Sequence, residues 1–376
     1  MQYLDVPTDS VTISNEDVEN IRNTLLNSDL TIFGSETLQK FESLLAHYLS
    51  REERLSCIAM PNCTSAIFIA LKLVGLTELD EIIAPNLTHV SAILAIVNIC
   101  KCKIRLYDFS HESYNIDLDH FQSLITSRTK AVIVSYLHGY PFNIKEIQKI
   151  CLRKNIILIE DAAQGLGVKV ESDFAGAIGD YGCFSFGANK LLKLGEGGAL
   201  VFQNKGKRNT INQYRHVGEV WKSNQLSTVE NNSTYADILK TGFDYVQYSF
   251  NFRVNPLGFV LGISQIKSLE YTIQVRREKL KIYQEVLGKI SGIQLISESV
   301  YNSAPISAWF LIDPDKFNIN ELIFQSISLG IPVGKFKYPV ISDIDLLKTH
   351  IANKSDVLKN SSTLIPIRHE VEHNRG

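Results

Sequence analysis

The chain has 376 residues, of which 45% are hydrophobic and 21% are charged. The chain is too long for one small hydrophobic core, but its length is ordinary for a large α/β domain with a second, smaller domain. The composition is typical of a soluble globular protein. The net charge is only −2, so nothing in the charge balance favours nucleic acid or an acidic membrane surface as a partner.

The cysteines and the amino terminus favour a cytoplasmic protein. The six cysteines are scattered, and no histidine or cysteine cluster at zinc-like spacing accompanies the close pair Cys100 and Cys102. We therefore expect reduced, mostly buried thiols and no metal site. The first residues lack the basic and apolar regions of a signal peptide, and no apolar run is long enough to span a bilayer.

Two helices are predicted before the first strand. Ser14 is typical of a helix N-cap and Asp17 of the N3 position, and the helix is expected to continue to about Leu26. After a turn that contains Gly34, hydrophobic residues recur at helical spacing to about Leu49.

From Ser56 onward, short apolar strands alternate with helices. The predicted strands are residues 56–60, 81–84, 103–107, 131–135, 156–160, 181–186 and 199–202. The predicted helices between them are at about 63–75, 89–100, 117–127 and 145–154. This alternation predicts an α/β fold with a mainly parallel sheet that is covered by helices on both faces.

The second half of the chain predicts a smaller domain. Residues 219–248 are rich in polar residues and are predicted to form a long loop. A long helix is expected from about Pro256 to Lys289, followed by strands near 292–296 and 307–312, a helix near 318–329 and a polar tail from Arg368. We predict a large domain with the N-terminal helices over residues 1–255. The linking helix and a small α+β domain would occupy 256–376.

A lysine and a carboxylate follow two of the predicted strands. Lys190 comes after strand 181–186 and before a glycine-rich turn, and Asp161 ends the preceding apolar strand. A lysine can form a Schiff base with pyridoxal phosphate, and a carboxylate can keep its pyridine nitrogen protonated. We hypothesise that Lys190 and Asp161 form this pair. Lys193, in the same loop, is the alternative lysine, and an N-cap is the alternative role for Asp161.

The other candidates are expected at the same edge of the sheet. Ligands of open α/β sheets bind at the carboxyl ends of the strands. Asp161, Lys190, Thr64 and the turn 85–89 all follow such ends in the predicted order.

Together these stretches resemble the DegT/DnrJ-type sugar aminotransferases, which are fold-type I pyridoxal phosphate enzymes. The resemblance runs from about residue 30 to 270 and continues more weakly through the small domain. It implies a fold-type I PLP-transferase in which Lys190, directly after Asn189, forms the internal aldimine and moves the substrate proton. Asp161 would be the partner of the pyridinium nitrogen.

The resemblance implies a phosphate site at the start of a helix. The stretch Asn62-Cys63-Thr64-Ser65-Ala66 resembles the family's Ser-Gly-Thr-Ala-Ala, so Thr64 and Ser65 would bind the cofactor phosphate. Cys63 replaces the usual glycine, which would make this turn less permissive. Ser185 matches a serine that reaches the same phosphate. A plain N-cap is the alternative for Thr64 and Ser65.

Two further residues are implied as contacts of the cofactor ring. Gln164 matches the residue that contacts the ring hydroxyl, with a capping amide as the alternative. His89 lies where the family commonly has an aromatic residue that stacks on the ring, and an imidazole can stack too. The alternative is a histidine at a helix start that is exposed to water.

One match implies a dimer. Asn251, in a match to Gly-Tyr-Asn-x-Arg, would reach the cofactor phosphate in the partner subunit's site, which implies a homodimer with shared sites.

The residues expected near the substrate match the family less closely. Arg253 would bind the donor carboxylate, or form a structural salt bridge. The tyrosine and histidine of the family's His-Leu-Tyr-Gly are exchanged here, which makes His138 a substrate candidate. Tyr338, in a small-domain loop, is another.

The implied reaction is the transfer of an amino group from glutamate or glutamine to a keto-sugar, expected to be a nucleotide-linked keto-deoxysugar, through pyridoxamine phosphate. The sugar, the nucleotide and the choice between C3 and C4 stay open. One alternative is a deoxysugar dehydratase of the same fold, but such relatives carry histidine in place of the Schiff-base lysine. Another is a non-catalytic regulatory relative, against which the complete set of Lys190, Asp161, Ser185 and Thr64 argues.

Overall fold

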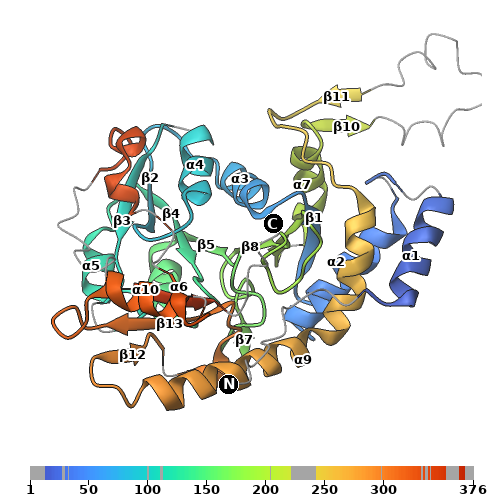
Figure 1. Ribbon diagram of the computed structural model, residues 1–376. Helices are drawn as coiled ribbons and strands as arrows, with labels where there is room; N and C mark the ends of the chain where they lie inside the picture. Colours follow the sequence, from blue (N-terminus) through green and yellow to red (C-terminus); the bar gives the residue numbers. More distant parts are fainter. Residues whose placement is uncertain are drawn as a thin grey trace, which may run out of the picture.

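A seven-stranded sheet forms the centre of the molecule (Figure 1). It is seen in a computed structural model, which describes residues 13–27, 30–32, 34–99, 101–110, 113–203, 205–221, 243–297, 299–331, 333–334, 338, 340–352 and 364–368. The strand order is β1-β9-β8-β5-β4-β2-β3. Strand β9 runs antiparallel to both of its neighbours, and the other six strands share one direction.

All seven of these strands were predicted from the sequence. They are β1 (Ser56–Met60), β2 (Glu81–Pro85), β3 (Lys103–Tyr107), β4 (Thr129–Ser135), β5 (Ile157–Asp161), β8 (Tyr181–Ser185) and β9 (Gly198–Phe202). Most of their residues are buried, as expected for strands that helices cover on both faces. The mainly parallel α/β sheet is therefore confirmed.

Helices pack on both faces of the sheet. One face carries α3 (Cys63–Val74), α4 (Val90–Ile99) and α7 (Arg208–Arg215). The other carries α2 (Glu36–Leu49), α5 (Leu118–Ser123), α6 (Ile144–Lys154) and α9 (Pro256–Leu287). Alternate strand residues enter the two cores: Ile82 lies in the first and Ile83 in the second.

The helix ends follow the local sequence. Helix α1 (Asn15–Leu26) begins with the predicted capping box, in which Ser14 Oγ accepts from the N–H of Asp17 at 3.1 Å and Asp17 Oδ2 accepts from the N–H of Ser14 at 2.9 Å. Helix α9 begins after the N-cap Asn255 with a proline at its first position. It runs along one side of the molecule from α1 and α2 to the small sheet (Figure 1).

The small sheet consists of β12 (Ile293–Leu295), β13 (Ser307–Ile312) and β14 (Leu364–Arg368), all antiparallel, with β13 in the middle. Helix α10 (Ile319–Ser328) follows β13. The chain then returns to the large sheet: the N–H of Ile104 donates to His350 O at 2.8 Å, and the N–H of Ala352 donates to Ile104 O at 2.8 Å. The domain division at residue 255 stays a prediction.

Short elements were missed from the sequence. Residues 219–248 were predicted as a loop, but its ends pair as β10 (Glu219–Trp221) and β11 (Phe243–Tyr245), and 222–242 lie outside the described residues. A small hairpin, β6 (Lys169–Val170) with β7 (Asp173–Phe174), was also missed. Arg368 belongs to β14 rather than to a polar tail, and 369–376 are outside the description. Single 3-10 turns occupy Lys205–Lys207, Val300–Asn302, Ile341–Asp343 and Asp345–Leu347.

The described cysteines lie in the core. Cys57, Cys63, Cys102, Cys151 and Cys183 are buried free thiols, in line with the sequence prediction. Within the described ranges, no three histidine, cysteine or carboxylate side chains gather as a potential metal site. None of the helices seen there has the length and apolarity needed to cross a bilayer.

Candidate active site

The carboxyl ends of the strands bring the predicted residues to one edge. Asp161 is the last residue of β5, and Lys190 lies in the loop after β8. Thr64 lies in the first turn of α3, which follows β1, and His89 follows β2. Because these four strands share one direction, their carboxyl ends meet at the same edge. The predicted clustering of these residues at one edge is therefore confirmed.

Lys190 is held in a tight turn by its backbone, whose N–H donates to Gly187 O at 3.1 Å. Its side chain is half-buried and forms no hydrogen bond or ion pair with any described residue. Burial lowers the pKa of Lys190, and the negative charge of Asp161 acts against that shift. The backbone of Lys193 is instead tied to α9 through Gln265, at 2.7 and 3.0 Å. Lys190 is thus the lysine of this loop whose charge interacts with Asp161.

The carboxylate of Asp161 is almost fully buried, with 6% of the residue exposed. Its Oδ1 accepts from the N–H of Ala163 at 3.1 Å, so a local capping contact coexists with the predicted role. Burial raises the pKa of Asp161, while the Ala163 N–H and the positive charge of Lys190 oppose the increase. A buried carboxylate can pair with a cationic group brought into the site.

The first turn of α3 is a potential phosphate site. Asn62 is the N-cap, and the N–H of Ser65 donates to Asn62 Oδ1 at 2.9 Å. The hydroxyl of Ser65 donates to Asn62 O at 2.7 Å, so both Ser65 donors are used within the cap. The hydroxyls of Thr64 and Ser185 form no hydrogen bond with any described residue. Thr64 and Ser185 therefore fit a phosphate contact better than the side chain of Ser65.

The residue in place of the family's glycine is accommodated without strain. Cys63 is the first residue of α3 and is not among the residues with positive φ, so the backbone at this position does not require a glycine. A close approach occurs instead at Gly198, where a Cβ atom would lie 2.5 Å from the carbonyl carbon of Asn62. The start of β9 therefore needs a glycine to pass the N-cap of α3.

These groups fit pyridoxal phosphate by the chemistry of their donors and charges. The N-terminus of α3 favours an anion such as a phosphate. Asp161 offers a negative charge for a protonated ring nitrogen, and Lys190 offers an amine whose charged form burial disfavours.

Contacts between side chains connect the sheet edge to Tyr338. Gln164 Nε2 donates to the hydroxyl of Tyr338 at 2.7 Å, and Gln164 Oε1 accepts from the N–H of His138 at 2.7 Å. The exposed ring of His89 meets the ring of Tyr338 edge to face, with centroids 5.4 Å apart. Tyr338 comes just before an antiparallel bridge between Val340 and Leu87. The structure thus brings together Gln164, His89 and Tyr338.

His138 connects two parts of the fold. Its φ is 54°, its Nδ1 is hydrogen-bonded to the hydroxyl of Ser307, and its ring lies 4.9 Å from that of Trp309. The N–H of Ile306 also donates to His138 O at 3.0 Å. These contacts attach the loop after β4 to strand β13, a structural role beside the predicted one in substrate binding.

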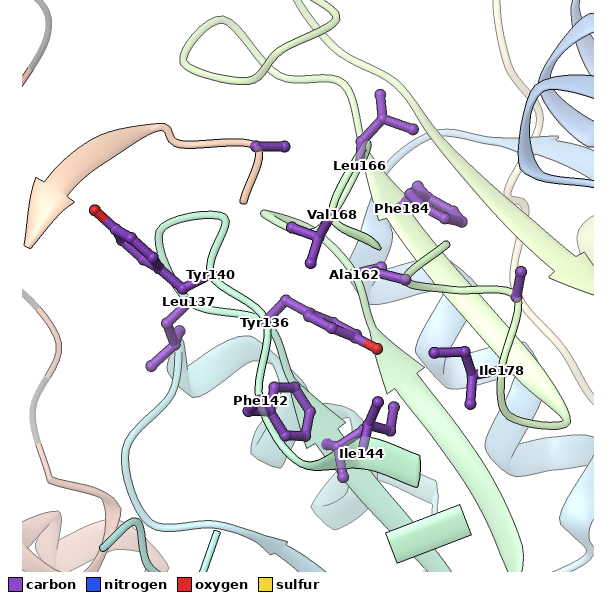
Figure 2. Close-up of a cluster of buried hydrophobic side chains, with 14 of the residues drawn as sticks. Tyr136, Leu137, Tyr140, Phe142, Ile144, Ala162, Leu166, Val168, Ile178 and Phe184 are labelled. Atoms are coloured by element: carbon purple, nitrogen blue, oxygen red, sulfur yellow. The ribbon is translucent and has the colours of Figure 1, made fainter. Parts of the chain in front are cut away.

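An apolar cluster and a buried carboxylate support the same loop. Figure 2 shows Tyr136 beside Phe142, and their ring centroids are 4.8 Å apart. The hydroxyl of Tyr136 donates to Glu160 Oε2 at 2.8 Å. Glu160 is fully buried, and burial raises its pKa. Its carboxylate also accepts, at 2.8, 2.7 and 2.6 Å, from the N–H groups of Gly176, Ile178 and Gly179.

Asn251 and Arg253 lie apart from these residues. Both are exposed, and Arg253 Nε donates to Asn251 Oδ1 at 2.9 Å. Asn251 forms an isolated antiparallel bridge with His216. No hydrogen bond or ion pair joins either side chain to the described residues at the sheet edge within this chain.

Four residues were not assigned these supporting contacts from the sequence: Cys63 and Ser135, which lie beside Asp161, and Tyr136, which is hydrogen-bonded to Glu160. The alternation of side chains along a strand is the one signal that could have identified Glu160. It places Glu160 and Asp161 on opposite faces, so only one of them can face the ligand.

The comparisons with known proteins agree on one family. A model of the "DegT/DnrJ/EryC1/StrS aminotransferase family" matches residues 11–365. An uncharacterised protein of Methanocaldococcus jannaschii is 30% identical over 319 residues, which cover 83% of this chain and 78% of the relative. A GDP-perosamine synthase of Escherichia coli is 25% identical over 266 residues, 71% of this chain and 67% of that enzyme.

The fold is shared with solved structures of the same kind. The structure of Escherichia coli GDP-4-keto-6-deoxy-D-mannose-3-dehydratase with bound hydrated PLP superposes with a TM-score of 0.84 at 21% identity, over 97% of this chain and 95% of that chain. This confirms the fold-type I architecture. From the family match over nearly the whole length, the chain belongs to the DegT/DnrJ/EryC1/StrS aminotransferase family, whose members are pyridoxal phosphate-dependent enzymes.

Proposed function

We propose that this enzyme transfers the amino group of glutamate or glutamine to a nucleotide-linked keto-deoxysugar. One observation carries the proposal: the buried carboxylate of Asp161 and the side chain of Lys190 lie at the same carboxyl edge of the sheet, where burial lowers the pKa of Lys190. The names of relatives support the substrate class, since the similar proteins include a GDP-perosamine synthase and a transaminase that acts on a nucleotide-linked amino sugar.

Each residue of the site has a distinct part in this chemistry. Bound pyridoxal phosphate supplies an electrophilic carbon and a ring that draws electron density from the reacting bond. Lys190, whose uncharged form burial favours, would hold the cofactor through its Nζ and would take up and return the substrate proton at that atom. Asp161 holds positive charge at the ring nitrogen. Thr64 and Ser185 bind the phosphate, and Gln164 orients the ring.

Dehydration of the sugar is the competing reaction, because a dehydratase shares this fold. Dehydratase relatives of this family carry histidine in place of the Schiff-base lysine, and Lys190 therefore favours amino transfer.

An isotope experiment tests the proposal. The protein is loaded with pyridoxal phosphate and given donors labelled with heavy nitrogen, together with GDP-, dTDP- and UDP-linked keto-deoxysugars. We expect the label to appear in the sugar, and we expect glutamate or glutamine alone to bleach the visible band of the cofactor. A sugar product that has lost a hydroxyl group and carries no label would contradict amino transfer.

We further propose that the active enzyme is a homodimer in which Asn251 reaches the phosphate in the partner subunit's site. Asn251 is exposed, and its side chain forms no hydrogen bond with the described residues at the sheet edge of its own chain. Large apolar side chains lie exposed just before it, with Tyr248 94% and Phe250 61% exposed. Exposed apolar groups of this kind are typical of an interface.

Hybrid dimers test this arrangement. Lys190→Ala and Asn251→Asp are each expected to lower activity by at least about 10²-fold, the second because it places a negative charge against a phosphate. Co-expression of the two variants with different tags yields hybrids that combine an intact Lys190 with the partner's intact Asn251 in one of the two sites. We expect those hybrids to regain activity. Hybrids as inactive as both parents would show that Asn251 acts within its own chain.

A further inference from the structure

The carboxylate of Asp161 is surrounded by buried side-chain donors that its predicted role leaves unexplained. The Sγ of Cys63 lies 3.5 Å from Asp161 Oδ1. The hydroxyl of Ser135 lies 3.5 Å from Asp161 Oδ2 and 2.9 Å from the hydroxyl of Thr88. The exposed fractions of Cys63, Ser135 and Thr88 are 7%, 1% and 0%. Cys63 lies in α3 and Ser135 in β4, and Thr88, which contacts Ser135, lies in the loop after β2.

We propose that Cys63 is a positioning residue for Asp161, whose carboxylate its thiol holds from one side while Ser135 holds it from the other, in the orientation that the ring nitrogen of the cofactor needs. This inference rests on the proposed role of Asp161. It assigns a part in the site to the residue that replaces the glycine of the related motif.

The thiol of Cys63 has one proton to donate and two acceptors within reach. Cys63 Sγ lies 3.3 Å from Cys183 O, so the neutral carbonyl competes with Asp161. A charged acceptor attracts a donor more strongly than a neutral carbonyl, which favours Asp161. Burial, followed by the charge of Asp161, raises the pKa of Cys63 well above its usual value, so that this residue stays a protonated donor.

The opposite side of the carboxylate is fixed by the sheet. Ser135 is paired with Asp161 in the register between β4 and β5. Its hydroxyl also contacts Thr88, which directly precedes the ring-stacking candidate His89. The partner of the ring nitrogen and the residue on the ring face are therefore connected through one pair of buried hydroxyls.

Three groups that lower the pKa of Asp161 come from separate elements. Lys190 lies in the loop after β8, His89 in the loop after β2, and Cys63 at the start of α3. Since the first two are cations or potential cations, Cys63 is the neutral donor among the three. A variant at Cys63 therefore alters the hydrogen bonding of Asp161 without removing a charge.

The test compares Cys63→Ala and Cys63→Ser with Cys151→Ala, which removes another buried thiol from helix α6. Two quantities are measured: the dissociation constant of pyridoxal phosphate, and the pH midpoint of the visible absorbance of the bound cofactor. For Cys63→Ala we expect about three- to tenfold weaker binding. We also expect a higher midpoint, because a ring nitrogen with less positive charge withdraws less electron density from the nitrogen of Lys190.

Cys63→Ser keeps a donor on the same Cβ and is expected to recover most of both changes, while Cys151→Ala should match the wild type. If Cys63→Ala does not fold, Cys63→Gly replaces it, because glycine is the residue of the related motif. Equal values for the Cys63 variants and Cys151→Ala would overturn the inference.

Asp161→Ala separates this failure from a failure of the proposed function. If Asp161→Ala leaves cofactor binding and the midpoint unchanged, Asp161 is not the partner of the ring nitrogen and the proposed site is wrong. If it changes both while the Cys63 variants change neither, the proposed function stands and the positioning role of Cys63 is rejected.

Discussion

Replacing Lys190 by alanine is expected to lower the rate of amino transfer by more than about 10³-fold, because the same Nζ acts as nucleophile and as proton carrier. Burial already shifts this lysine toward its uncharged form, and no ion pair in the described structure has to be broken before it reacts. The measurement is a single turnover with labelled donor, followed by borohydride reduction of the wild type and the variant.

Lys193→Ala is the matched control for this experiment, because it removes a lysine from the same loop. We expect reduction to attach the cofactor covalently to the peptide that contains Lys190 in the wild type and in Lys193→Ala, and to leave the Lys190→Ala chain unmodified. Loss of trapping in Lys193→Ala, with trapping kept in Lys190→Ala, would exchange the assignments of the two lysines.

Replacing Asp161 by asparagine is expected to have opposite effects on activity and on stability. Activity should fall by about 10²- to 10³-fold, since a neutral amide cannot hold positive charge at the ring nitrogen. The stability of the cofactor-free chain should rise at neutral pH, because burial raises the pKa of Asp161 and the folded state therefore disfavours its ionised form.

The pH dependence gives this prediction its sign. A carboxyl group whose pKa is higher in the folded than in the unfolded chain does not change the stability at a pH below both pKa values, where it is protonated in both states. The loss of stability begins as the pH rises through the pKa of the unfolded chain, and it is complete above the pKa of the folded chain. Thermal unfolding of the cofactor-free proteins should therefore favour Asp161→Asn near neutral pH, and the difference should vanish in acid. A variant that is less stable than the wild type at neutral pH would contradict the argument.

The central sheet was predictable because its strands are short and apolar and because, from β1 to β5, a helix separates each strand from the next. The elements that were missed carry no such signal. Strands β6 and β7 have two residues each, which is too short for an alternating pattern to be recognised. Strand β14 contains Pro366, a residue that argues against a strand, but it lies at the edge of its sheet, where proline is tolerated.

The edge at which the site lies was predictable for the same reason, since residues at the ends of parallel strands share one edge. The contacts around each residue were not. Nothing in the sequence shows that both hydrogen-bond donors of Ser65 are used by Asn62, or that His138 is hydrogen-bonded to Ser307. Such details depend on the rotation of single side chains and on segments more than a hundred residues apart in the sequence, as with the pair Gln164 and Tyr338.

The hydrogen bonds of Glu160 have a consequence for the neighbouring Asp161. Successive residues of β5 point to opposite faces, so a slip of β5 by a single position would exchange the two carboxylates. The hydrogen bonds of Glu160 come from Tyr136 and from the N–H groups of Gly176, Ile178 and Gly179, which converge at this position of β5. A shift of β5 would leave the buried carboxylate of Glu160 without these donors, so they fix the register of the strand. A residue that faces away from the ligand thereby determines that Asp161 is the carboxylate that faces it.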